Sequence, residues 1–177
     1  MITYKHVAFA LLDTGLLTGE QVRAVLDRST DHLDEHLVPS AVAHALEDFG
    51  VAVSVPLDDV GDLKGSYEDL LTRAAALTGG TVTVSDVVLH QGEFSTDGVR
   101  DDVLEFEVNG RPVTVDAEHR SDRYLDHLAA TDAVDALAPE DSRAFHYVDF
   151  GGPGTVLLLA TPEQARTLED HLGLKLH

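Results

Sequence analysis

Residues 103–116 read VLEFEVNGRPVTVD, and this stretch decides the fold of the surrounding chain. Apolar and polar residues alternate along both of its halves, which is the period of a strand with one buried face. Asn109-Gly110 separates the halves, and this dipeptide favours the two positive φ angles of a type I′ turn. The stretch therefore predicts a β-hairpin in which Phe106 lies opposite Val113.

The glutamates of this hairpin predict a polar sheet face. In the same register Leu104 lies opposite Val115, while Glu105 and Glu107 point to the other face. An antiparallel sheet commonly has one face on the core and the other in water. We therefore expect one face of the sheet to be wet or to be covered by something polar.

The sequence on either side of the hairpin predicts an α+β domain. A helix that begins at Ser66 and a strand in TVTVSDVVLH precede the hairpin. A helix that begins at Ser121, two strands in AFHYVDF and TVLLLA, and a helix that begins at Thr161 follow it. The order from residue 66 is α-β-β-β-α-β-β-α, which predicts a mostly antiparallel sheet of about five strands with helices on one face.

The first part of the chain predicts helices. Apolar residues recur at helical spacing through the first fifty residues, and Thr18 and Gln21 form a capping box at the start of one helix. The pattern changes to strand-like alternation just after Gly50. These changes divide the chain into a helical N-terminal segment at 1–57, a linker loop at 58–65 and an α+β domain at 66–177.

The charge of the chain narrows the range of partners. Its 32 acidic and 12 basic residues give a formal net charge of -20 at pH 7. Such a field repels phosphate backbones and anionic lipids, so we expect neither nucleic acid nor a membrane surface as partner. The short apolar run near the N-terminus has no basic cluster before it and is followed directly by Asp13, so we interpret it as a helix and not as a signal sequence. A basic protein is the partner that this charge favours.

Cysteine is absent from the sequence, which removes disulfides, thiolate nucleophiles and cysteine-based metal sites from consideration. A cytoplasmic location is the expectation, and no cofactor is expected. The composition also offers an adaptive explanation of the acidity, because arginine outnumbers lysine nine to three and aspartate is abundant. Under that alternative the protein is acidic through salt adaptation alone.

A second alternative is a metal-dependent hydrolase. The stretch HLDEH matches H-x-x-E-H, a helix motif in which two histidines bind zinc and the glutamate handles the proton of the zinc-bound water. Here His32 and His36 would be the ligands and Glu35 the base. Two histidines and a glutamate on one exposed helix are few fixed ligands, so we expect no stoichiometric zinc.

The stretch DAEHRSDRYLDH at 116–127 concentrates further titratable residues. A helix that begins at Ser121 would place Asp122 and Asp126 on one face, where they could face a cation or an arginine. An acidic first turn is also favoured by the helix dipole alone, which explains the same pattern without any ligand.

Three stretches carry a resemblance to known proteins. They are the L-L-x-x-A-A-x-L helix core from Leu70 to Leu77, the hairpin EFEVNGRPVTV, and FHYVDFGGPGTVLLLATPEQARTLEDHLGL. Over about 110 residues the chain is similar to small acidic bacterial proteins of uncharacterised function, some of which resemble immunity proteins of polymorphic toxins. The shared motifs are caps and turns, so the resemblance implies a toxin inhibitor but assigns no functional residue.

These observations predict a non-enzymatic acidic module that binds a basic protein, such as the toxin or nuclease domain that an immunity protein inhibits. Clustered carboxylates speed the encounter with a cationic partner and occupy the surface that it would use for nucleic acid. The residues expected to bind the partner form three acidic patches: Asp31, Asp34 and Glu35; Asp58, Asp59 and Asp62; and Glu105 and Glu107.

Overall fold

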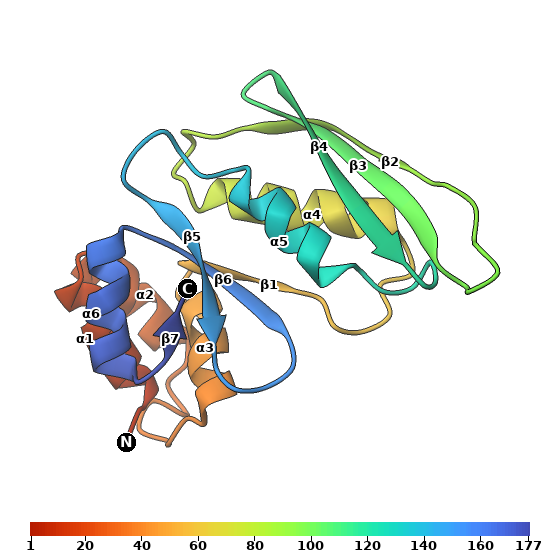
Figure 1. Cartoon of the computed structure of the whole chain (residues 1–177). Helices are drawn as coiled ribbons and strands as arrows, with labels where there is room; N and C mark the ends of the chain where they lie inside the picture. The colour runs from red at the N-terminus through yellow and green to blue at the C-terminus, as the bar shows by residue number, and fades with distance from the viewer. The chain divides into compact units, whose positions relative to one another are not determined.

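The computed structural model describes residues 1–177 and contains six helices and seven strands, so the α+β prediction is confirmed (Figure 1). The helices are α1 (Tyr4–Asp13), α2 (Gly19–Arg28), α3 (Pro39–Asp48), α4 (Leu63–Ala76), α5 (His127–Asp135) and α6 (Pro162–Leu172). The strands are β1 (Ala52–Val55), β2 (Val84–His90), β3 (Arg100–Val108), β4 (Arg111–His119), β5 (Ala144–Asp149), β6 (Thr155–Ala160) and β7 (Lys175–Leu176). None of the six helices combines the length and the hydropathy that crossing a bilayer requires.

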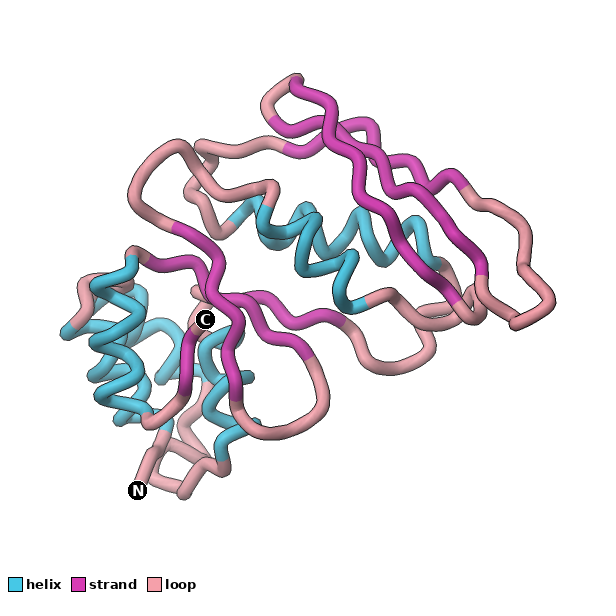
Figure 2. The backbone as a smooth tube through the Cα atoms, in the orientation of Figure 1, coloured by secondary structure: helices cyan, strands magenta, loops and turns pink.

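The strands form two sheets, whereas the sequence predicted one sheet of about five strands (Figure 2). The first sheet has the order β1-β6-β5-β7, and β5 pairs antiparallel with both β6 and β7. The second sheet has the order β2-β3-β4 and is antiparallel throughout. The strand-like alternation after Gly50 therefore belongs to a strand that pairs with a segment about a hundred residues later, which local patterns do not show.

The chain divides into two units. Unit 1 consists of residues 1–54 and 140–177, and unit 2 consists of residues 55–139. This division differs from the predicted one, in which a helical segment, a linker at 58–65 and an α+β domain follow one another along the chain. The N-terminal helices belong with the C-terminal strands because both contribute to one core.

The core of unit 1 draws on both ends of the chain. Val7 and Leu11 of α1, Leu46 of α3 and Leu158 of β6 are at most 1% exposed and all belong to it. All six residues of β6 are buried; β1 and β5 flank the strand, and Val156, Leu158 and Ala160 belong to this core. The apolar faces of the N-terminal helices are thus buried by residues from the far end of the chain.

Two helix starts in unit 1 confirm their sequence signals. The hydroxyls of Thr18 and Thr161 accept hydrogen bonds from the backbone N–H groups of Gln21 and Gln164, respectively. Each glutamine side chain accepts in return from the N–H of its threonine. Both ends are therefore complete capping boxes.

The predicted hairpin is confirmed in unit 2, and it is longer than the sequence predicted. β3 and β4 pair over all nine residues of each strand, with Phe106 opposite Val113. Asn109 and Gly110 are the only residues between the strands, with φ angles of 50° and 78°. Helices α4 and α5 cover one face of the sheet (Figure 1), where Leu104 and Phe106 are fully buried.

Two helices of unit 2 begin at aspartates and not at the serines that the sequence analysis selected. Asp62 accepts a hydrogen bond from the third N–H of α4, four residues before Ser66. Asp126 accepts from the second and third N–H groups of α5, five residues after Ser121. A carboxylate also interacts favourably with the positive end of the helix dipole, so the aspartate is the stronger cap.

Replacing Gly110 with valine is expected to lower the free energy of unfolding by about 1–3 kcal/mol, because a β-branched residue would sit at a positive φ angle. No atom lies within 4 Å of a Cβ built at Gly110, so the cost is conformational and not a clash. Urea denaturation measures it. The matched control is Gly110→Asn, which tolerates positive φ and should lose less. An unchanged urea midpoint for the valine variant would contradict the turn.

Candidate functional site

The first predicted acidic patch, Asp31, Asp34 and Glu35, lies in turns between α2 and α3 of unit 1. Asp34 accepts a hydrogen bond from Lys5 Nζ at 2.7 Å. Glu35 lies 2.8 Å from His32 Nδ1, and this hydrogen bond with the nearby negative charge raises the pKa of His32. Two of the three carboxylates are thus already paired with cationic or titratable partners.

The same turns change the interpretation of HLDEH. Residues 32–36 do not form a helix, so His32 and His36 are not held one turn apart on a helix face as the H-x-x-E-H motif requires. No group of three or more histidine or carboxylate side chains anywhere in the chain is arranged to hold a metal ion. The helical setting on which the hydrolase alternative depended is therefore wrong.

The second predicted patch, Asp58, Asp59 and Asp62, lies in the loop that leads into α4 of unit 2. Asp59 accepts a hydrogen bond from the N–H of Gly61 at 3.0 Å, and Asp62 is the N-cap of α4. These two carboxylates therefore stabilise the local backbone. Asp58 is exposed.

The third predicted patch is part of a larger acidic surface. Glu105 and Glu107 lie on the face of the β2-β3-β4 sheet that α4 and α5 do not cover, as predicted. Asp101 of β3 and two residues of β4, Asp116 and Glu118, lie on the same face because of the strand register. We call these five residues the acidic sheet face.

The acidic sheet face places like charges side by side. Asp101 lies directly opposite Glu118 in the β3–β4 register. Such cross-strand neighbours have Cβ atoms about 4.5–5.5 Å apart, and like charges there are destabilising. Two carboxylates of this face have neighbouring side chains: His90 Nε2 lies 2.8 Å from Glu105 Oε2, and a terminal nitrogen of Arg120 lies 4.0 Å from Glu118 Oε1.

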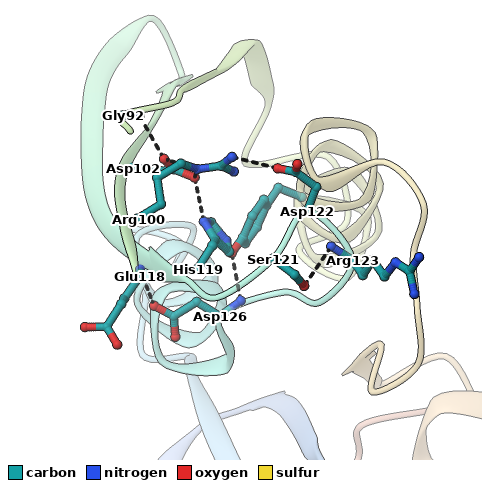
Figure 3. A network of polar contacts seen from close by, with 10 residues as sticks. Gly92, Arg100, Asp102, Glu118, His119, Ser121, Asp122, Arg123 and Asp126 are labelled. Carbon is teal, nitrogen blue, oxygen red and sulfur yellow. Dashed lines mark hydrogen bonds and ion pairs between the residues drawn. The ribbon is translucent and has the colours of Figure 1, made fainter. Parts of the chain in front are cut away.

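The structure also contains a buried polar network that the sequence analysis missed (Figure 3). Its centre is Asp102, whose side chain has no exposed surface. The two oxygens of Asp102 accept from Arg100 Nε at 2.8 and 3.0 Å, from the N–H of Gly92 at 3.0 Å, and pair with His119 Nδ1 at 2.7 Å. Burial alone raises the pKa of Asp102, but the hydrogen bonds from Arg100, Gly92 and His119 outweigh burial and hold this pKa below its ordinary value.

The network continues from His119 to α4 and α5. His119 Nε2 lies 2.8 Å from the hydroxyl of Tyr67, and that hydroxyl accepts from the N–H of Asp126 at 3.0 Å. Both ring nitrogens of His119 and the Tyr67 hydroxyl have partners if the hydroxyl donates to Nε2 and His119 donates from Nδ1 to Asp102. Burial and the nearby carboxylates raise the pKa of Tyr67, so this hydroxyl keeps its proton.

Arg100 is the cation of the network. One of its terminal nitrogens lies 2.7 Å from Asp122 Oδ1, and its guanidinium carbon lies 4.7 Å from the centre of the Phe94 ring. The other terminal nitrogen is buried and has no hydrogen-bond partner. The hydrogen bond from Arg100 to Asp102 raises the pKa of Arg100 against the effect of burial, so the guanidinium stays charged.

An Asp-His pair joined to a tyrosine hydroxyl has the donors and acceptors of a proton relay. Tyr67, Asp102 and His119 are nevertheless at most 1% exposed, so none of them presents a reactive atom to a substrate. The network instead ties α4 to the ends of β3 and β4 and to the segment that leads into α5 (Figure 3). We assign it a structural role.

A sequence signal for this network existed. Continuing the hairpin register three pairs beyond 103–116 places Arg100 opposite His119 and puts Asp102 on the inward face. Residues 93–102 are polar and glycine-containing, so local alternation predicts strands only within 103–116. The related prediction that Asp122 and Asp126 share a helix face is wrong, since α5 begins only after Asp126.

A cavity of about 480 Å³ lies where the end of β4 meets the start of α5. Three residues of the acidic sheet face line it, together with Asp126 and Leu128 of the adjoining segment. The complete lining is Asp101, Asp102, Val103, Asp116, Ala117, Glu118, Asp126 and Leu128. We call this the acidic cavity, and its chemistry suits a cationic group.

No protein-family model, curated protein or solved structure matches this chain. The geometry and charge of its own side chains are therefore the basis for assigning a function.

Proposed function

We propose that this protein is a non-enzymatic binding module that recognises a basic protein through its acidic sheet face. The observation that carries the proposal is the clustering of five carboxylates on the exposed face of the β2-β3-β4 sheet, with Asp101 directly opposite Glu118. An immunity or inhibitor protein that covers the nucleic-acid surface of a basic toxin or nuclease domain is the specific form of this proposal. The lack of cysteine suits action in the cytoplasm.

The folded protein does not need the carboxylates of the acidic sheet face. Like charges directly across two strands oppose folding, typically by a few tenths of a kcal/mol to about 1 kcal/mol per pair. Nothing in the fold of unit 2 requires these side chains to be acidic, because they lie on the face away from α4 and α5. A cationic partner would remove the repulsion on binding. The acidic sheet face therefore favours a bound state over the free protein.

Salt adaptation accounts better for the other two predicted patches than for this face. Asp34, Glu35 and Asp59 all have local partners, so they already contribute to the structure of the free protein. Asp101, Asp116 and Glu118 share one face and one cavity, and Arg120, 4.0 Å from Glu118, is the cation beside them. Adaptation alone calls for exposed carboxylates, not for their convergence on one concave site.

Affinity capture with three baits tests the proposal. The baits are the wild type, a sheet-face variant (Asp101→Asn, Glu105→Gln, Asp116→Asn), and a control variant (Asp31→Asn, Asp34→Asn, Glu35→Gln). Both variants lose three negative charges, so they differ only in where the charge is removed. We expect a basic protein to be retained by the wild type and the control and lost by the sheet-face variant. Equal retention by both variants would contradict the proposal.

Association with the captured partner should depend steeply on salt. The Debye length shrinks from about 30 Å at 0.01 M to about 10 Å at 0.1 M ionic strength, so electrostatic steering weakens over this range. Steering raises association rates by about 10- to 1,000-fold, and we expect much of that gain to disappear as salt is added. Stopped-flow mixing measures the rate. A rate that does not change with salt would be inconsistent with recognition through the acidic sheet face.

A further inference from the structure

The outer edge of β4 has unpaired backbone groups. β4 lies at the edge of the β2-β3-β4 sheet, and the N–H of Glu118 faces away from β3 because it donates to Asp126 Oδ2 at 2.9 Å. Backbone groups two residues apart in a strand point the same way, so Thr114 and Asp116 also direct their N–H and C=O groups outward. No hydrogen bond joins these outward groups to another part of the chain.

The free stretch has a defined beginning and end. Pro112 has no N–H to offer, and Asp126 already occupies the N–H of Glu118. The open edge therefore runs from Pro112 to Asp116. This segment is about as long as an ordinary β-strand. The register of β4 with β3 is unbroken, so no bulge interrupts the outward backbone groups of β4.

The other edge of the same sheet is protected. β2 has a register break between Ser85 and Val88, and Asp86 within it has a φ angle of 54°. Bulges of this kind twist an edge away from pairing, and natural sheets use them to block unwanted partners. β4 has no such break, which distinguishes it as the edge that is open to a further strand.

The acidic cavity indicates which side chain the added strand carries. It lies at the Asp116 end of the open edge, and it adds Asp101, Glu118 and Asp126 to the carboxylate of Asp116. A volume of about 480 Å³ is within the usual range of ligand pockets, about 300–1,000 Å³. Its carboxylates accept hydrogen bonds, and they are not arranged to hold a metal ion. The cavity therefore suits a lysine ammonium or an arginine guanidinium, both of which donate.

A second copy of this chain fits poorly. Each copy carries a formal net charge of -20, and Asp116 lies within the open edge. Pairing two such edges would bring carboxylates of the two copies together without a cation between them. Charge complementarity therefore selects an extended segment that carries basic side chains.

We infer that β4 accepts an extended basic segment of the partner as a fourth strand of the β2-β3-β4 sheet, with a lysine or arginine side chain in the acidic cavity. Backbone hydrogen bonds to Thr114 and Asp116 hold the segment, and the carboxylates select its charge. This inference rests on the proposed function, because it names the element and the chemistry by which the same acidic surface holds its partner.

The test uses the full chain and a fluorescent peptide that alternates threonine and arginine over ten residues, followed by anisotropy. Thr114→Pro removes one outward N–H without changing the charge, and the N–H it removes makes no bond to β3. Its control is Thr114→Val, which keeps the N–H. We expect Thr114→Pro to weaken peptide binding by about tenfold or more, and Thr114→Val by less than about twofold. Equal affinity of the two variants would overturn the inference.

A second measurement does not depend on the variants. Hydrogen exchange at the N–H groups of Thr114 and Asp116 in the wild type should slow when the peptide is added, and exchange in β2 should not. Unchanged exchange at both positions with peptide bound would also overturn strand addition.

A separate variant distinguishes this inference from the proposed function. Asp116→Asn with Glu118→Gln keeps the backbone edge and removes charge, and we expect it to weaken the peptide by about tenfold and to flatten the salt dependence. If this variant loses binding while Thr114→Pro does not, strand addition is wrong and the acidic surface stands. If this variant binds as the wild type does, charge recognition at this surface is wrong, and the proposed function fails with it.

Discussion

Replacing Asp102 with alanine is expected to lower the free energy of unfolding by about 3–5 kcal/mol, the usual cost of removing one partner from a buried ion pair. The loss is large because Asp102 neutralises Arg100, which is only 4% exposed, and also pairs with His119 and the N–H of Gly92. Urea denaturation followed by circular dichroism measures the change.

The neighbouring residue provides a matched control. Asp101 is one position away on the same strand, but it is exposed and lies opposite Glu118. Asp101→Ala should therefore change stability by no more than about 0.5 kcal/mol, and relief of the repulsion favours a small gain. If both alanine variants lost the same stability, the network would not hold unit 2 together.

The effect of Asp102 should also depend on pH. Its pKa in the folded protein lies below the ordinary value of an aspartate, so its charged form stabilises the fold. This contribution is complete above the ordinary pKa of about 4 and is lost as the pH falls through the lower pKa of the folded protein. The stability difference between the wild type and Asp102→Ala should therefore be full at pH 7 and shrink in acid.

Replacing Phe106 with alanine is expected to cost about 3–5 kcal/mol, because it leaves a cavity between the sheet and its helices. Phe106 has no exposed surface and is among the largest fully buried side chains of the chain. The control is Phe94→Ala, a change of the same size at a residue that is 47% exposed. That variant should lose at most about 1 kcal/mol, the contribution of its contact with Arg100. Similar losses in the two variants would contradict the packing of the hairpin on α4 and α5.

The features that could be predicted from the sequence are those that depend on near neighbours. The turn at Asn109-Gly110 follows from two residues, and the capping boxes at Thr18 and Thr161 each follow from four. Alternation along β3 identified the exposed face of Glu105 correctly because the strand period is two. Each of these signals is complete within one short stretch.

The rest of the structure depends on contacts that no short stretch contains. β1 was expected to precede an independent domain, and it pairs instead with β6, so the division of the chain differs from the predicted one. The candidate site shows the same limit. The buried network joins Tyr67, Asp102 and His119 from three elements, and each of them alone is typical of an ordinary polar residue in its stretch.

The discontinuous chain of unit 1 has a consequence for synthesis on the ribosome. Residues 1–54 cannot complete their core until β6 at 155–160 has been made, whereas unit 2 is one continuous segment that is complete once residue 139 has left the exit tunnel. At about 5–20 residues per second, the N-terminal helices wait on the order of 5–20 s for the strand that completes the core around Leu11 and Leu46. We therefore expect unit 2 to fold before unit 1 during synthesis.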